Sequence, residues 1–192
     1  MGDDFVIRSL GYGEGRENVI KGRYIEKVVD ITIENKNRNP VAGIAVKFVM
    51  SNYSQNSNNY FENMLGETSN IRCARIPYFQ IFIVPEEMPY YNKDGEITKA
   101  EIFTNHNVEK YLKLSQDNPA TFLHTPDKTL LMVVALPKLV LAKTTNKKKY
   151  KTNYANADIK LSKAIADNFD NSVILNNYDE FMNKIAHRIK SE

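Results

Sequence analysis

The chain has 192 residues, a net charge of +3 and a hydrophobic share of 42%, values that are ordinary for a soluble globular protein. This length favours one domain with a sizeable core, and no apolar run reaches the ~18 residues that a membrane span needs. Cys73 is the only cysteine, which excludes a disulfide framework and a cysteine-based zinc site. The first residues lack the basic-then-apolar pattern of a secretory signal. We therefore expect a cytoplasmic protein without a membrane partner.

The N-terminal part of the chain predicts a helix followed by a β-hairpin. From Arg16, apolar residues recur at the spacing of an amphipathic helix. The end of this helix is ambiguous, because residues 28–33 fit helical spacing and also alternate as a strand does. We take the strand interpretation, in which "VVDITIEN" (28–35) and "VAGIAVKFVMS" (41–51) form a hairpin around the turn cluster "ENKNRNP" (34–40).

Beyond the hairpin, helices are expected to alternate with strongly apolar strands. Two segments, "YFQIFIVP" (78–85) and "TLLMVVALP" (129–137), are typical of strands that are buried on both faces. The other expected elements are a polar loop at 51–59, helices at about 60–72 and 99–114, a basic turn at 146–151, and amphipathic helices at 159–169 and 177–189. This alternation predicts an α/β sandwich with a partly parallel sheet.

The second hairpin strand carries one charged side chain within an apolar stretch, "GIAVKFVMSN" (43–52). A lysine is almost never fully buried without a partner. Lys47 therefore either reaches solvent at a sheet edge, where lysines also limit aggregation, or faces a pocket that is lined with acids. Its apolar neighbours on both sides favour the pocket.

The order of elements in residues 16–137 is a helix, a hairpin with a lysine on its second strand, a crossover helix and a further strand. This order resembles the core of the PD-(D/E)XK nucleases, the fold of most type II restriction endonucleases. The resemblance implies an α/β, restriction-endonuclease-like three-layer sandwich in which helices flank a mixed central sheet. Residues 1–192 would then form a single nuclease domain, with C-terminal helices at 156–190 outside the core.

In that family, an acid on the first hairpin strand and an acid-x-Lys motif on the second strand bind Mg²⁺ and activate water. The resemblance maps the first acid onto Asp30 and the lysine onto Lys47. Two acids hold a divalent ion against phosphate oxygens, while the lysine orients the attacking water and stabilises developing charge. The implied function is a Mg²⁺-dependent endonuclease that cleaves double-stranded DNA at a short recognition site. Because both strands of a symmetric site are cut, a homodimer is expected.

Position 45 departs from the family pattern, because Ala45 stands where the second acid is usual and alanine cannot bind a metal. One subgroup of restriction enzymes carries this glutamate on the following helix, where this chain has Glu62 and Glu67. Fourteen residues (48–61) separate Lys47 from Glu62, close to the spacing in that subgroup. We therefore expect Asp30 and Glu62 to bind the metal, with Glu67 as the alternative. The competing explanation is that Ala45 is a substitution that removes activity.

Two further acids remain open as members of the site. Glu34 would replace Asp30 if Asp30 is a solvated residue near the end of the first helix. Glu26 lies one helical turn from Asp30 and either supports the site or faces water.

The polar loop at 51–59 connects the lysine strand to the helix glutamates, so it should lie near bound DNA. Asn and Gln side chains pair bidentately with adenine edges, and lysines contact phosphates. The candidate DNA-binding residues are Ser51, Asn52, Gln55, Asn56, Asn58, Lys147, Lys148 and Lys149. An ordinary polar connection and a solvated basic turn explain the same residues.

Two other functions fit the same residues. The first is a DNA-binding module on the same fold that has lost catalysis, with Ala45 as the trace of that loss. The second is a repair or nicking nuclease that acts as a monomer.

Overall fold

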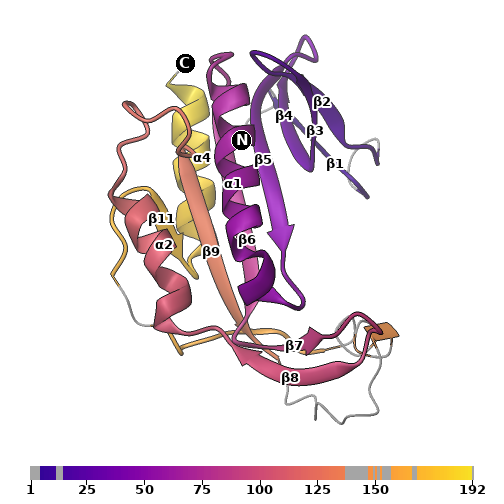
Figure 1. Ribbon diagram of the computed structural model, residues 1–192. Helices are drawn as coiled ribbons and strands as arrows, with labels where there is room; N and C mark the ends of the chain where they lie inside the picture. The colour runs from indigo at the N-terminus through magenta and orange to yellow at the C-terminus, as the bar shows by residue number, and fades with distance from the viewer. Residues whose placement is uncertain are drawn as a thin grey trace.

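The computed structural model describes residues 5–11, 15–136, 147–148, 150, 152, 157–165 and 168–191. Within these ranges the chain is an α/β protein with a mixed, curled central sheet and three helices (Figure 1). The strands of this sheet are β1 (Phe5–Ser9), β4 (Ile31–Asn35), β5 (Pro40–Phe48), β6 (Tyr78–Pro85), β9 (Lys128–Ala135), β10 (Lys160–Leu161) and β11 (Val173–Leu175).

The sheet runs in the order β1-β4-β5-β6-β9-β10, and β11 also pairs with β9. The pairs β1–β4, β4–β5 and β9–β10 are antiparallel, whereas β5–β6, β6–β9 and β9–β11 are parallel. The expected hairpin and the two expected apolar strands are thus confirmed: β4 and β5 form the hairpin, and β6 and β9 lie side by side next to β5. A parallel pair needs a crossover, and α1 (Tyr53–Arg72) supplies it between β5 and β6.

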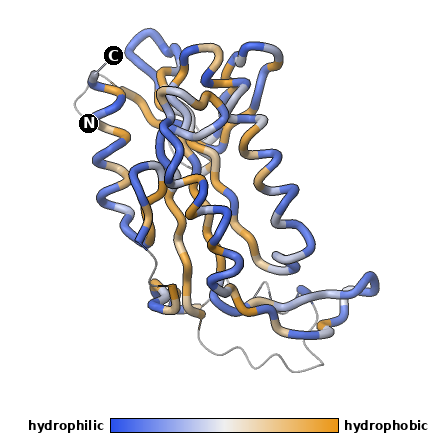
Figure 2. Tube along the Cα trace, turned by 60° about the vertical axis from the view of Figure 1, so that its left-hand side comes forward, coloured by the Kyte–Doolittle hydropathy of each residue, from blue (hydrophilic) through white to orange (hydrophobic). Residues whose placement is uncertain are grey.

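Helices cover both faces of the sheet. In β6, Phe82 and Val84 pack into a core formed with α1 and α2 (Asn105–Gln116). Phe79 and Ile81 pack into a second core with α4 (Tyr178–Lys190). Successive strand residues point to opposite faces, so a strand that is apolar throughout requires this double cover. Figure 2 shows the same distribution, with the apolar segments gathered in the strands of the central sheet.

β5 follows the same alternation with one difference. Ala42 and Ile44 belong to the core under α4. Ala45 and Lys47 instead lie on the α1 side, where both line a cavity. The α1 side of β5 is therefore incompletely filled by apolar side chains, and this leaves the hollow in which the candidate site lies.

The expected helix from Arg16 is wrong. The chain forms a second hairpin there, β2 (Asn18–Lys21) and β3 (Glu26–Val29), which packs Ile20 and Val29 against Ile71 and Tyr78. A residue that is distant in sequence stabilises the turn. The Asn70 side chain accepts hydrogen bonds from the N–H groups of Tyr24 (2.9 Å) and Ile25 (3.2 Å). A Cβ at Gly22 would lie 2.1 Å from the Asn70 amide nitrogen, so glycine permits this approach. Local helical spacing could not reveal a turn that α1 supports.

The expected loop at 51–59 and the start of the next helix are also wrong, because α1 already begins at Tyr53. The Glu101 carboxylate accepts the N–H of Tyr53 (2.8 Å) and the hydroxyl of Ser54, and so satisfies the first turn of the helix. Such a cap replaces a local capping residue by one that is distant in sequence. The sequence alone therefore misplaced the helix start.

The segment expected as a helix at 99–114 is part strand and part helix. Its first residues belong to β8 (Ile97–Ile102), which pairs with β7 (Glu87–Tyr91) in a hairpin at one end of the central sheet (Figure 1). Helix α2 starts only at Asn105, after the capping box of Thr104 and Asn107. The first residues of this segment are a strand and not a helix because they form a ladder with β7.

The C-terminal helices expected at 156–190 are confirmed only in part. Helix α4 spans the second of them. The described residues 157–165 contain the short strand β10 and no helix, because this segment pairs with the edge of β9 instead. Among the described residues, no helix is long and apolar enough to cross a membrane.

Candidate functional site

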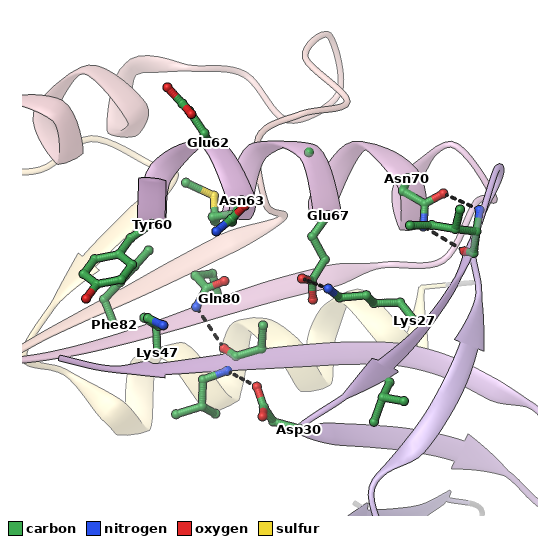
Figure 3. A pocket seen from close by; sticks show the side chains of 16 residues that line it. Lys27, Asp30, Lys47, Tyr60, Glu62, Asn63, Glu67, Asn70, Gln80 and Phe82 are labelled. Atoms are coloured by element: carbon green, nitrogen blue, oxygen red, sulfur yellow. Dashed lines mark hydrogen bonds and ion pairs between the residues drawn. The ribbon is translucent and has the colours of Figure 1, made fainter. Parts of the chain in front are cut away.

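The site is a cavity of about 620 Å³ between β5, the β2–β3 hairpin and α1, which we call the α1 cavity (Figure 3). Four sequence candidates that were expected to form one site, Asp30, Lys47, Glu62 and Glu67, are all among its lining residues. They come from three segments that are far apart along the chain, so their convergence results from the fold.

Asp30 is the residue between β3 and β4, where the chain passes from the small hairpin into the central sheet. Its Oδ2 accepts the backbone N–H of Val46 at 2.7 Å. This bond fixes the half-buried carboxylate beside the strand that carries Lys47. Asp30 is thus not a solvated residue at a helix end.

Lys47 lies on β5, a central strand, as expected, but its side chain is exposed rather than buried. Its Nζ lies 4.5 Å from the centroid of the Tyr60 ring. Among the described residues, Lys47 forms no ion pair, so it is directed at an aromatic face and not at the Asp30 carboxylate.

The two helix glutamates differ in direction. Figure 3 shows Glu67 pointing from α1 toward the strands and Glu62 pointing outward, away from Asp30 and Lys47. Residues five positions apart on an α-helix are rotated by about 140°, so both cannot face the same strand. The geometry favours Glu67 over Glu62 as the acid that acts with Asp30.

The Glu67 carboxylate has two partners, Lys27 and Tyr78. Its Oε2 lies 2.8 Å from the Lys27 ammonium, and its Oε1 accepts the hydroxyl of Tyr78. Burial, followed by the charges of Glu67 and Asp30, raises the pKa of Tyr78 far above its ordinary value. Tyr78 therefore stays protonated and donates to Glu67 across the whole physiological pH range.

Two polar residues of the cavity were missed from the sequence. Lys27, on β3, lies in the segment that was expected to be a helix, and its contact with Glu67 depends on the unexpected hairpin. Gln80, on β6, lies directly opposite Ala45 in the pairing of β5 with β6. A signal for Gln80 was present, because it is the one uncharged polar amide in the apolar stretch "YFQIFIVP".

The two further acids lie elsewhere. Glu34 is buried, its Oε1 is 2.8 Å from the Arg8 guanidinium, and it does not line the α1 cavity. Glu26 is exposed and lies opposite Lys21 in the backbone pairing of β2 with β3. Neither residue is placed to replace Asp30.

The amides proposed to contact DNA are largely engaged within the protein. Asn52 donates to the carbonyl of Tyr91 (2.9 Å) and accepts its N–H (3.0 Å), which joins the start of α1 to β7. Asn58 accepts the Lys110 ammonium at 2.9 Å. The remaining members of this group are Ser51, which precedes α1 and is half-buried, Gln55, which accepts the Tyr90 hydroxyl at 3.4 Å, and Asn56, which donates to the Asn52 carbonyl at 3.0 Å.

The basic turn is described only in part. Lys147 has its Nζ 5.9 Å from the centroid of the Tyr91 ring, and Lys148 is exposed. Lys149 lies outside the described residues. Lys147 therefore lies near Tyr91 of β7.

Known proteins give no guide to this site. Comparisons with protein-family models, with curated proteins and with solved structures each found no match. Within the part of the chain that the structure describes, no group of three or more His, Cys, Asp or Glu side chains could hold a metal ion. Any ion in the α1 cavity would therefore depend on two carboxylates together with other oxygen donors.

Proposed function

We propose that this chain is a Mg²⁺-dependent endonuclease of the type II restriction class, which hydrolyses phosphodiester bonds of double-stranded DNA at a short recognition site. The observation that supports this proposal most is the convergence of Asp30, Lys47 and Glu67 on the α1 cavity. An antiparallel hairpin, a crossover helix and two parallel strands position them, an order similar to the restriction-endonuclease-like fold. We further propose a homodimer that acts in the cytoplasm.

The donor set of the cavity fits Mg²⁺. This ion commonly keeps several waters and is held by one or two carboxylates together with substrate phosphates. Asp30 uses Oδ2 for the Val46 N–H, and its other oxygen accepts no hydrogen bond from the described residues. Glu67 is bonded through both oxygens, but a carboxylate has about four acceptor sites. When bound, the ion would polarise the phosphate and lower the pKa of an attacking water.

Lys47 is suited to contact the reacting phosphate. Its ammonium is exposed at the cavity, and within the described residues no carboxylate neutralises it. A positioned cation at the phosphate stabilises the negative charge that develops during hydrolysis. Tyr60 restricts the positions available to the ammonium, since the ring face attracts it.

A second candidate is a DNA-binding module that has lost catalysis. Ala45 supports it, because no acid stands on the strand two residues before Lys47. The engagement of Glu67 by Lys27 and Tyr78 supports it as well, since both partners compete with a metal for that carboxylate.

Plasmid cleavage separates the two candidates. We expect the wild-type chain with Mg²⁺ to produce discrete fragments and the Asp30→Asn variant to produce none, while both bind the plasmid. Retention of plasmid by the wild-type chain without any cleavage would support the inactive module and overturn the nuclease proposal.

A further inference from the structure

Gln80 is an anomaly in the core of the sheet. It lies in the middle of β6, whose other residues are apolar or aromatic, and it is only 4% exposed. Buried polar side chains almost always satisfy their hydrogen-bonding groups within the protein. The Gln80 amide nevertheless lines the α1 cavity, so its orientation indicates what it can bind.

The orientation of the Gln80 amide is set by its neighbours. Its Nε2 donates to the carbonyl oxygens of Ile81 (2.9 Å) and Ala45 (3.2 Å). Only the NH₂ end of an amide can donate, which assigns nitrogen to this side and oxygen to the other. The oxygen accepts no hydrogen bond from the residues that the structure describes, and Figure 3 shows it on the side nearer Glu67.

The pairing of β5 with β6 places this oxygen beside the position of the absent acid. Ala45 and Gln80 are directly paired in the parallel ladder, and neighbouring strands are about 4.8 Å apart. The methyl group of Ala45 leaves open the space that a longer side chain would fill. A side chain from the adjacent strand can therefore present an oxygen to the same part of the cavity.

We propose that Gln80 Oε1 is the third protein oxygen of the divalent cation site, acting with Asp30 and Glu67 in place of the acid absent at position 45. This inference rests on the proposed function of the cavity. Amide carbonyl oxygens are hard donors of the kind that Mg²⁺ accepts. A neutral donor also avoids the repulsion that a third carboxylate would meet beside Asp30 and Glu67.

Manganese binding without DNA tests this role. We would measure Mn²⁺ affinity from the loss of the free-ion electron paramagnetic resonance signal. Gln80→Met, which has a similar shape and no polar atoms, should weaken Mn²⁺ binding at least about tenfold, since even residues that only orient a metal ligand change affinity 10–100-fold. Gln116→Met, the same substitution at an exposed position at the end of α2 and outside the cavity, should leave the affinity unchanged.

Two further variants separate ligation from folding, because Gln80→Met also removes two hydrogen bonds to the backbone. Gln80→Glu keeps an oxygen at this place and should bind Mn²⁺ at least as tightly as the wild type. Adding Ala45→Glu to Gln80→Met should restore binding, since a carboxylate then returns on β5.

The outcomes distinguish the role of Gln80 from the proposed function of the cavity. Wild-type affinity in Gln80→Met, weaker binding by Gln80→Glu, or no rescue by Ala45→Glu overturns the role of Gln80, while a wild type that binds Mn²⁺ keeps the proposed function. A wild type that binds no Mn²⁺ overturns both.

Discussion

The two lysines of the α1 cavity stand at its opposite ends and have opposite surroundings. Lys27, on β3, forms an ion pair with Glu67 at 2.8 Å. Lys47, on β5, contacts the face of the Tyr60 ring, and no described carboxylate lies within ion-pair distance. The positive charge of Lys27 is thus compensated inside the protein, whereas that of Lys47 is available to an anion from outside.

This difference suggests separate tasks for the two ends of the cavity. The Lys27 end contains the carboxylates of Glu67 and Asp30, with which the proposed cation would interact, and Lys27 would compete with that cation for Glu67. The Lys47 end offers a cation and aromatic rings, which suit a phosphate and the groups attached to it. Four substitutions test this division, and they follow from the largest expected effect to the smallest.

Removing the ammonium at the exposed end should cause the largest loss of activity. Lys47→Met is expected to slow DNA cleavage about 10²–10³-fold, the usual effect of removing one group that stabilises transition-state charge. DNA affinity, measured by gel shift in Ca²⁺, should change little, because other basic residues supply most of it. Equal losses in cleavage and affinity would make Lys47 a binding residue instead.

The two glutamates of α1 provide a matched pair. Glu67→Gln should weaken Mg²⁺ binding at least about tenfold, as expected for a group at the metal, and cleavage should need correspondingly more Mg²⁺. Glu62→Gln, which removes the same charge from the outer side of the helix, should behave as the wild type in a Mg²⁺ titration of cleavage. The reverse pattern would identify Glu62, the glutamate favoured by sequence spacing, as the metal ligand.

Releasing Glu67 from its ion pair with Lys27 should strengthen metal binding, whereas Glu67→Gln should weaken it. Lys27→Met is expected to tighten Mn²⁺ binding about 1.4- to fivefold, since a partly exposed ion pair contributes roughly 0.2–1 kcal/mol. Lys21→Met, an exposed lysine of the same hairpin outside the cavity, is the control, with unchanged affinity expected. Weaker Mn²⁺ binding by Lys27→Met would show that Lys27 supports the metal site and does not compete with it.

A change no larger than that of Lys27→Met should come from the aromatic ring beside Lys47. Tyr60→Leu removes the ring face and should slow cleavage about two- to fivefold, the equivalent of a cation–π contact of 0.5–1 kcal/mol. Tyr60→Phe retains the face and should cleave at the wild-type rate. If Tyr60→Phe loses as much as Tyr60→Leu, the phenol oxygen and not the ring is important.

The sequence predicted those parts of the fold in which the pattern of apolar residues alone determines the structure. The apolar runs of β6 and β9 have no polar side that could face water, so they had to be covered strands. The helix start at Tyr53 and the hairpin around Gly22 depend on Glu101 and Asn70, which are distant in sequence. No local pattern contains such contacts.

The same limit applies to the candidate site. The resemblance of the order of elements to the PD-(D/E)XK nucleases named Asp30 and Lys47, and the pairing of β4 with β5 brings the two segments side by side. The choice between Glu62 and Glu67 depended on where α1 begins and how it is rotated, which chain spacing does not determine. Gln80 enters the cavity through the pairing of two parallel strands, and that pairing is not visible until the sheet order is known.

The most direct test of the α1 cavity as the metal centre is affinity cleavage of the protein itself. Fe²⁺ would be substituted for Mg²⁺, and ascorbate with peroxide would generate hydroxyl radicals that cut the backbone close to the ion. Mass spectrometry should find cuts around Asp30, Ala45–Lys47, Glu67 and Gln80, and excess Mg²⁺ should suppress them. Cuts confined to other segments, or cuts that Mg²⁺ does not suppress, would contradict the assignment of this cavity as the active centre.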